Sequence, residues 1–372
     1  METNAPIDQT SFDYIVVGAG IAGLSAAASL ASYGRTALVE MEAQPCHHSS
    51  GRSAAIFVPS YGNDVVRQLT AMSKRIIDNT MPQALARTRG IIVVARKGGE
   101  AGIAEPGQIK IEPDEIFNRV PIMRADLLSH GWFEADTSDM DVHAMHLHYL
   151  KQLRSNGRLI TNFLVRSAFC HDGRWQLSNG NLVIDAPVVV NASGAWLEQT
   201  AALFGADPLG MVAKRRSAAL ADPPSGLDPS DWPMVVDVEE TVYFKPDAGK
   251  LMICPADTTP SEPCDTWPED IDVAIGIDRF QNLTTHEVQR VSHMWAGLRS
   301  FVRDECPLIG PDAKVEGLFW LGALGGFGVQ TAPATGAIAA AMAAGARLPS
   351  GAEDWLVEAI SPSRMFENGD EQ

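Results

Sequence analysis

The opening of the chain places two short apolar runs on either side of a segment of small residues, an order that predicts a β-α-β unit. Residues 14–17 and 36–39 are apolar runs of strand length. Residues 24–33 between them are alanine-rich and apolar, which predicts a helix that Gly34 ends. Such a unit is typical of α/β proteins with a parallel sheet.

Further along, the hydrophobic pattern alternates between helical and strand-like stretches. Apolar spacings of three and four predict helices over residues 64–79 and 141–154, and a last helix is expected over residues 329–344. Residues 159–169 and 174–177 are expected to pair as strands around a turn. The other predicted strands are residues 91–94, 188–190, 234–236, 241–244 and 317–322.

This order of elements predicts two domains. Prolines and strand-like runs gather between residues 214 and 299, whereas nucleotide-binding elements occur at the start and again near residues 190 and 325. We therefore expect an α/β fold in which an antiparallel-sheet domain of α+β character is inserted into a Rossmann-like domain. The expected boundaries are residues 10–80, 140–210 and 305–372 for the Rossmann-like domain, and 81–139 and 211–304 for the inserted one.

Composition and charge narrow the function classes. The chain has 372 residues, of which 45% are hydrophobic and 20% are charged, as in globular proteins. Its 46 acidic and 29 basic residues give a net charge of -17, which argues against nucleic acid or an anionic membrane surface as a partner. We expect a cytoplasmic protein, because no signal peptide and no run of about 18 apolar residues is evident.

Cysteine and histidine usage predicts neither disulfides nor a metal site. The adjacent His47 and His48 point apart in an extended chain, and no acidic or cysteine cluster joins them in the sequence. The cysteines are scattered, without a C-x-x-C pair, as expected for free thiols in a reducing compartment. They are Cys46, Cys170, Cys254, Cys264 and Cys306.

The strongest chemical signal is a G-x-G-x-x-G motif that lies between the first strand and the first helix. Gly18 allows the tight turn, Gly20 lets the backbone approach a pyrophosphate, and Gly23 lets the helix pack close to the strand. Glu40 ends the second strand, where its carboxylate can accept hydrogen bonds from a ribose. The complete order of strand, motif, helix, strand and acid predicts a dinucleotide-binding site.

Four segments of the chain together resemble one enzyme family, the D-amino acid oxidase/glycine oxidase family of FAD enzymes. They are residues 18–23 with Glu40, residues 49–54, residues 191–196 and residues 325–328. The resemblance covers essentially the whole chain. Further stretches resemble the bacterial D-arginine dehydrogenases of that family, namely residues 51–55, 214–218, 245–249 and 295–301.

The resemblance implies an FAD-binding domain and a substrate-binding domain with the flavin ring between them. It also implies oxidation of a D-amino acid by hydride transfer from Cα to flavin N5, followed by hydrolysis of the imine to a 2-oxo acid and ammonia. FAD is expected to bind non-covalently. The residues expected around it are Gly18, Gly20, Ile21, Ala22, Gly23, Glu40, His48, Ser49, Arg52, Ser53, Ala54, Val165, Gly194, Trp196, Gly326, Gly328, Gln330 and Thr331.

The same resemblance assigns roles at the reacting end. Arg299 is expected to hold the substrate carboxylate through a guanidinium fork, with Arg216 and Tyr243 assisting. Tyr61 is expected in a lid over the site, and the amides that follow Gly326 are expected to face the flavin N1–C2=O edge. The alternatives from the residues alone are a structural salt bridge for Arg299, a core position for Tyr243 and an ordinary loop aromatic for Tyr61.

The chain departs from the arginine-selective relatives where the substrate side chain would bind. Gly90 aligns with their acidic residue, and Ile56 and Val58 align with a histidine and a threonine. A cationic substrate tail would be buried there without a counter-charge, which is unfavourable. Together with Met234 and Val236, these residues predict an apolar pocket for a neutral D-amino acid or a related secondary amine.

Two alternatives remain open from the sequence. An oxidase of the same fold would pass electrons from a secondary or other amine to O₂, and a non-catalytic flavin-binding protein would have lost amine oxidation. The electron acceptor and the oligomeric state are not readable from the sequence.

Overall fold

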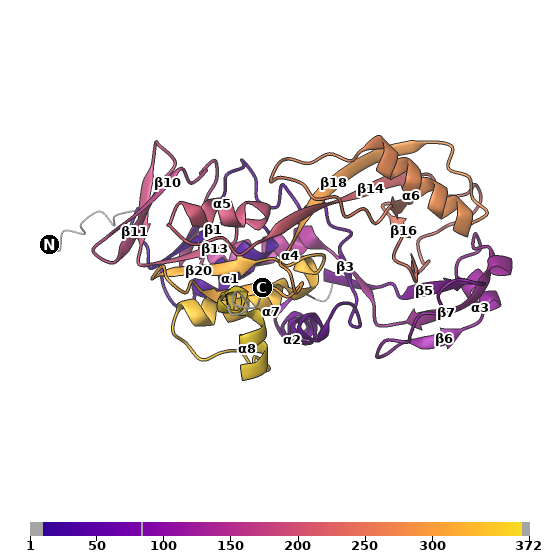
Figure 1. Cartoon of the computed structure of the whole chain (residues 1–372), viewed down its shortest axis with the longest axis horizontal. Helices are drawn as coiled ribbons and strands as arrows, with labels where there is room; N and C mark the ends of the chain where they lie inside the picture. Colours follow the sequence, from indigo (N-terminus) through magenta and orange to yellow (C-terminus); the bar gives the residue numbers. More distant parts are fainter. Residues whose placement is uncertain (1–9, 83–84, 367–372) are drawn as a thin grey trace.

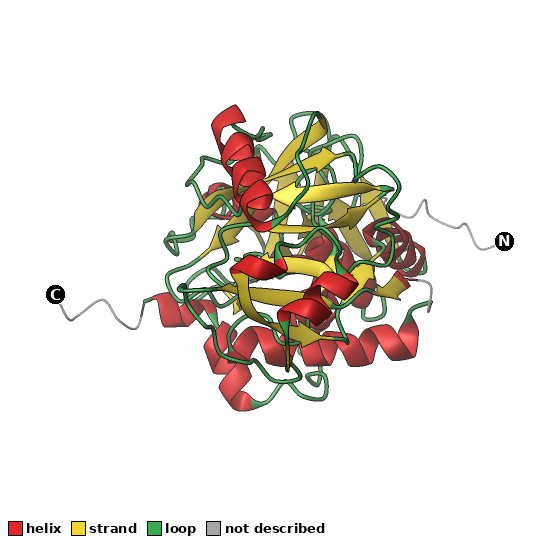
Figure 2. Cartoon of the chain, turned by 90° about the vertical axis from the view of Figure 1, so that its right-hand side faces the viewer, coloured by secondary structure: helices red, strands yellow, loops and turns green. Residues whose placement is uncertain are grey.

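The computed structural model describes residues 10–82 and 85–366 and shows an elongated molecule with two lobes (Figure 1). One lobe holds a sheet of mainly parallel strands, and the other holds a larger mixed sheet. In the view turned by 90°, strands run through the middle of the molecule and long helices lie on its outside (Figure 2). No helix in the described ranges is long and apolar enough to cross a membrane.

The first lobe is a six-stranded sheet with helices on one face and a small sheet on the other. Neighbouring strands of this sheet run parallel to each other, except that β19 and β20 at its edge are antiparallel. The strand order is β19 (Leu308–Pro311), β20 (Leu318–Gly322), β13 (Val188–Asn191), β1 (Tyr14–Val17), β2 (Thr36–Val39) and β9 (Gly157–Ile160). The small sheet consists of β10 (Ser167–His171), β11 (Arg174–Ser178) and β12 (Val183–Ala186).

The helices of this lobe are rich in small residues because they pack very closely. Helix α1 (Ile21–Leu30) lies against α7 (Gly328–Ala343), and almost every residue of both is buried. A Cβ at Gly336 would lie 2.3 Å from the Oγ atom of Ser25, so only glycine fits at this crossing. Helices α2 (Asp64–Thr80) and α4 (Val142–Leu153) flank this pair and complete the layer.

The second lobe is an eight-stranded sheet built from two separate parts of the chain. Its strand order is β18 (Val291–Phe301), β14 (Val212–Ala221), β17 (Lys250–Cys254), β16 (Tyr243–Asp247), β15 (Met234–Asp237), β5 (Ile91–Arg96), β7 (Leu128–Glu134) and β6 (Ile109–Ile111). Helices α6 (Asp270–Leu283) and α3 (Pro113–Arg119) share an apolar core with one of its faces. The other face carries a second apolar cluster, which includes Tyr243 and loop residues of the first lobe.

Short strands and two short helices complete the structure. β3 (Ile56–Phe57) and β4 (Ala86–Thr88) both pair with β8 (Ser138–Met140). Helix α5 (Leu197–Ala202) follows the turn after β13, and α8 (Asp354–Ile360) follows α7.

The α/β fold class predicted from the sequence is confirmed, with four local corrections. Residues 159–169 do not form one strand, because Asn162 at φ 56 interrupts them and sends β9 and β10 into different sheets. The sheet expected to be antiparallel contains one parallel pair, β5 with β15. Helix α6 lies in the stretch where only strands were expected, and α1 begins at Ile21 rather than residue 24.

Candidate functional site

The glycine turn after β1 is shaped by close backbone contacts. A Cβ at Gly18, whose φ is +98, would lie 2.6 Å from the carbonyl oxygen of Ala192 at the end of β13. A Cβ at Gly23 would lie 1.9 Å from the carbonyl oxygen of Gly18, so the helix can approach the strand only without a side chain there. Gly20 is the N-cap of α1 and makes no side-chain cap, which leaves the positive end of the helix facing the adjoining space.

Two side chains fix this turn from outside it. Glu40 accepts hydrogen bonds from the amide of Ala19 at 2.7 Å and from the amide of Glu42 at 2.9 Å. Ser50 Oγ accepts a hydrogen bond from the amide of Ile21 at 2.9 Å. Ser50 was not among the residues expected near the cofactor, because nothing in the local sequence distinguishes it from the other serines of its loop.

Two adjoining cavities meet at this turn, and one of them reaches the second lobe. One, the Glu40 cavity, has a volume of about 300 Å³ and is also lined by Val165, His48 and Trp196. The other, the Arg299 cavity, has a volume of about 160 Å³. The two share part of their walls, so together they form one elongated site of the kind that a dinucleotide needs. The shared residues are Gly20, Ser49, Ser50, Ala192, Gly194 and Ala195.

The loop between β2 and β3 joins this site to the second lobe. Ser49 Oγ donates to the carbonyl oxygen of Leu298 at 2.6 Å. Arg52 donates to the carbonyl oxygens of Ala296 and Thr266 at 3.1 and 3.0 Å and forms an ion pair with Asp265. The Arg52 guanidinium is thus engaged with the protein. Arg52 still lines the Arg299 cavity, as do Ser53 and Ala54.

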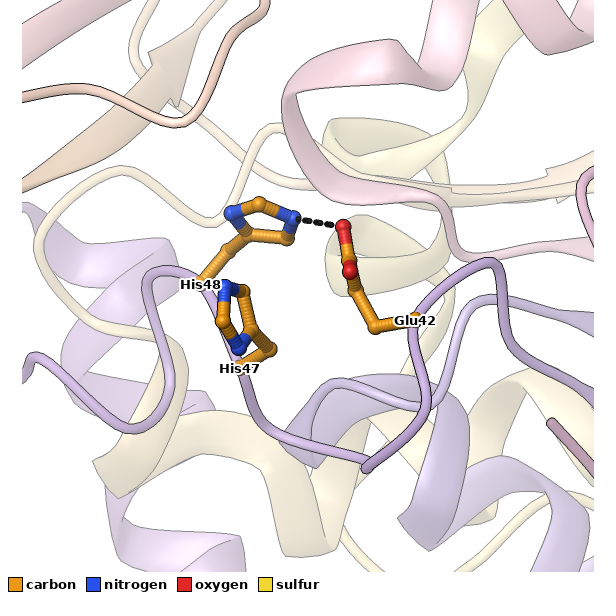
Figure 3. Close-up of side chains that lie close together, drawn as sticks. All are labelled: Glu42, His47 and His48. Carbon is orange, nitrogen blue, oxygen red and sulfur yellow. Dashed lines mark hydrogen bonds and ion pairs between the residues drawn. The ribbon is translucent and has the colours of Figure 1, made fainter. Parts of the chain in front are cut away.

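His47 and His48 have acidic neighbours, contrary to the expectation from the sequence. His48 Nε2 lies 3.0 Å from Glu42 Oε1 (Figure 3), and Asp265 lies 3.8 Å from His47 Nε2. The candidate ligand atoms of Glu42, His47 and His48 lie within 4.8 Å of one another. The contact with Glu42 and the ring of Trp196, whose centroid lies 4.7 Å from that of His48, orient His48 at the Glu40 cavity.

At the Arg299 end of the site, strand alternation turns two arginine side chains toward one face of the second sheet. Arg216 pairs with Gly297 in the β14–β18 ladder, so Arg216 and Arg299 point to the same side of the sheet. A Cβ at Gly326 would lie 2.7 Å from Arg299 Nη1, which places the loop before α7 directly against the guanidinium. Arg216 Nε is buried without a hydrogen-bond partner among the described residues. A buried N–H donor of this kind calls for an acceptor that the protein does not supply.

The two residues that precede Arg216 in the chain make other contacts. Arg215 points to the opposite face and pairs with Glu269 and Asp272. The Lys214 amine lies 4.8 Å from the ring centroid of Phe301.

Two tyrosines accompany the arginines. Burial raises the pKa of Tyr243 and of Tyr61, and the positive charges of Arg299 and Arg216 oppose the rise in both cases. Both phenols therefore stay protonated at neutral pH and can donate hydrogen bonds. Tyr243 lines the Arg299 cavity, and the Tyr61 ring packs 5.0 Å from that of Phe327 at the start of α7.

Four of the five residues expected in the side-chain pocket share an apolar cluster on this face of the second sheet, and Gly90 is not part of it. None of the five is in the wall of the Arg299 cavity. Val58 and Met234 are buried in one apolar cluster with Tyr243, and Ile56 and Val236 pack against it. Gly90 lies at the start of β5 with φ +78, and a Cβ there would lie 2.8 Å from the ring of Phe133. The sequence did not indicate Ile91, Ala218, Met252 and Cys254, which complete the cluster.

Two expected cofactor neighbours lie inside the helix layer. The Gln330 side chain accepts from the amide of Val58 at 3.2 Å and donates to Thr70 at 2.9 Å. Thr331 Oγ1 donates to the carbonyl oxygen of Phe327 at 2.8 Å. Neither residue is part of the cavity walls, whereas Gly328 is.

Comparison with known proteins gives a match over most of the chain. The sequence model of the FAD dependent oxidoreductase family DAO matches residues 13–342. Among solved structures, glycine oxidase from Geobacillus kaustophilus aligns with a TM-score of 0.78 and 17% identity, covering 95% of this chain and 99% of that one. L-proline dehydrogenase from P. horikoshii aligns with a TM-score of 0.80 and 16% identity, covering 98% and 100%. At these identities the likeness concerns the fold.

One curated relative matches a short part of the chain. The tRNA 5-methylaminomethyl-2-thiouridine biosynthesis bifunctional protein MnmC of Acidovorax sp. (strain JS42) is 38% identical over 79 residues. The match covers 20% of this chain and 12% of the length of that relative.

Proposed function

The chain belongs to the DAO family of FAD-dependent oxidoreductases, and from this premise we propose that it oxidises a D-amino acid with a neutral, apolar side chain. The product would be an imine, which water hydrolyses to a 2-oxo acid and ammonia. The observation that carries the proposal is the pair of arginines, Arg299 and Arg216, on the wall of a partly apolar cavity.

The elongated site fits FAD. The G-x-G-x-x-G turn and the open N-terminus of α1 suit a pyrophosphate, and Glu40 retains lone pairs for a ribose after accepting from two amides. His48, Val165 and Trp196 would line the adenosine part, and Gly326 and Gly328 would line the flavin part. When bound, FAD supplies the two-electron acceptor that takes a hydride from the substrate carbon.

The arginines would bind the substrate carboxylate. A carboxylate accepts two parallel charged hydrogen bonds from a guanidinium, which fixes both its position and its orientation. The unpartnered Nε of Arg216 and the protonated phenol of Tyr243 are further donors beside Arg299. An anionic group in this cavity would therefore supply an acceptor for Arg216 Nε, which has none among the described residues.

The same positive charges would favour the neutral, reactive form of the substrate amine. The described lining of the Arg299 cavity contains no Asp, Glu or His, so no side chain there is suited to take a proton from the substrate. Positive charge from Arg299 and Arg216 favours the neutral form of a nearby amine over its ammonium form. The neutral amine carries the lone pair that is needed to release a hydride from Cα, and its proton would leave through solvent.

An anaerobic panel tests the proposal. FAD-loaded enzyme would be mixed with D-amino acids, their L-enantiomers and secondary amines, and the flavin absorbance would be followed before and after O₂ is admitted. We expect neutral D-amino acids to bleach the flavin fastest. Preferential bleaching by an L-amino acid or a secondary amine would replace this substrate class, and no bleaching by any amine would favour a non-catalytic flavoprotein. Rapid return of the absorbance in O₂ would identify an oxidase.

We also expect acid precipitation to release the cofactor as free FAD. Burial and the neighbouring Glu40 raise the pKa of Cys46 to about 12, so this thiol, which lines the Glu40 cavity, is protonated and a poor nucleophile. His48 is engaged with Glu42. Absorbance and chromatography of the supernatant check this, and yellow colour that stays with the precipitate would contradict it.

A further inference from the structure

The loop that carries Tyr61, residues 58–62, is held in place by contacts with three other parts of the structure. The amide of Val58 donates to Gln330 on α7 at 3.2 Å, and the carbonyl oxygen of Gly62 accepts from Arg67 on α2 at 2.6 Å. Between these ends, Ser60 is bound by Glu134 of the second lobe. We call residues 58–62 the Tyr61 loop.

Glu134 is an unusual residue at its position. It ends β7 and is only 2% exposed. Its cross-strand partner is Ile91, so it lies on the face that carries the apolar cluster with Tyr243. A buried carboxylate needs hydrogen-bond donors, and among the described residues Ser60 supplies two of them. The Ser60 amide donates to Oε1 at 3.2 Å, and the Ser60 hydroxyl donates to Oε2.

This contact bears directly on the position of Tyr61. Ser60 precedes Tyr61 in the chain, and a residue whose amide and hydroxyl are both bound leaves its neighbour little freedom. The Tyr61 ring rests against Phe327, and its phenol lies in the electrostatic field of Arg299 and Arg216. The loop therefore spans from Glu134 to the arginines that would hold the substrate carboxylate.

We propose that Glu134 is a positioning residue, which clamps the Tyr61 loop through Ser60 and so fixes Tyr61 over the carboxylate-binding arginines. This inference rests on the proposed function for its effect on catalysis, but the clamp itself does not. The clamp joins the two lobes beside the apolar cluster that contains Tyr243, where a fixed loop would exclude water from the bound amine.

The clamp needs hydrogen bonds more than it needs charge. Burial raises the pKa of Glu134, while bonds from Ser60 and Gln108 oppose the rise. A neutral carboxyl or amide group could still accept from the Ser60 amide and donate to the Ser60 hydroxyl. Glu134→Gln should therefore preserve the clamp, whereas Glu134→Ala should abolish it. This pair separates the loss of a contact from the loss of a charge.

Steady-state kinetics of the FAD-loaded variants test the effect on substrate. We expect Glu134→Ala to raise KM for a neutral D-amino acid about tenfold, equivalent to about 1.4 kcal/mol, with little change in kcat. Glu134→Gln should stay near the wild-type KM. Combined with Tyr61→Phe, Glu134→Ala should raise KM by less than the product of the two single effects, because both act through the same phenol. Multiplicative effects, or an unchanged KM in Glu134→Ala, would overturn the positioning role.

Hydrogen exchange tests the clamp without any substrate. A peptide that spans residues 55–66 should exchange faster in Glu134→Ala than in the wild type or in Glu134→Gln, while the flavin content stays the same. Equal exchange in all three proteins would overturn the clamp. If no amine reduces the wild-type flavin, the proposed function fails, and the exchange comparison still decides whether Glu134 holds the loop.

Discussion

Arg299→Ala is expected to lose most of the amine-oxidising activity while it keeps its FAD. The guanidinium lies against Gly326, in a cavity where we propose that it binds the substrate carboxylate. Removal of one partner of a buried charged pair costs about 2–5 kcal/mol, which corresponds to roughly 30- to 4,000-fold in kcat/KM. Steady-state kinetics and flavin absorbance of the purified variant measure the two quantities separately.

Two further variants serve as controls for this prediction. Arg299→Lys should recover only part of the activity, because an ammonium group cannot make the bidentate contact. Arg303→Ala removes an exposed arginine two residues beyond the end of β18 and should leave the kinetics unchanged. Wild-type kinetics in Arg299→Ala would show that Arg299 is structural.

The second large effect is expected in substrate selectivity. D-Leucine, D-methionine and D-phenylalanine should have higher kcat/KM values than D-arginine and D-lysine, because the residues that we propose around the substrate side chain, Ile56, Val58, Met234 and Val236, belong to the apolar cluster that contains Tyr243. Each buried methylene of the substrate should favour binding by about 0.8 kcal/mol. An unpaired ammonium group buried in the same place should weaken binding by roughly several kcal/mol. Competition between one substrate of each kind measures the ratio directly.

A preference for the basic amino acids would point to Glu134 as the missing counter-charge. Its oxygens are already bound by Ser60, which is why we do not expect this result. Gly90→Glu is a poor way to restore basic selectivity, since a side chain at this φ +78 position would collide with Phe133. Val58→Thr is a milder change toward the arginine-selective relatives and should shift the ratio only slightly.

Local patterns predicted the parts of the fold that depend on neighbours in the sequence. The glycine motif and the apolar runs located β1, α1 and β2, because each feature acts within a few residues. The family resemblance, rather than any local pattern, supplied the proposed role of Arg299.

What the sequence did not reveal depends on contacts between distant residues. Ser60 and Glu134 are 74 positions apart, and the parallel pairing of β5 with β15 joins segments that no turn signal connects. One acidic neighbour of His47 and His48, Asp265, reaches them from the second lobe, whereas the other, Glu42, is close in the sequence. Helix α6 was missed because the proline-rich stretch around it suggested strands.

The strand order of the first sheet has a consequence for how the chain folds. β1 lies between β2 and β13, β13 pairs with β20, and α1 packs against α7. A chain that emerges from the ribosome would therefore hold β1 with an open edge until residues near 190 appear, and α1 without its main partner until residues near 343 appear. Such distant pairings slow folding and prolong the exposure of apolar surface. We therefore expect FAD to bind only late in biosynthesis, after the residues near 325 that line its site have been made.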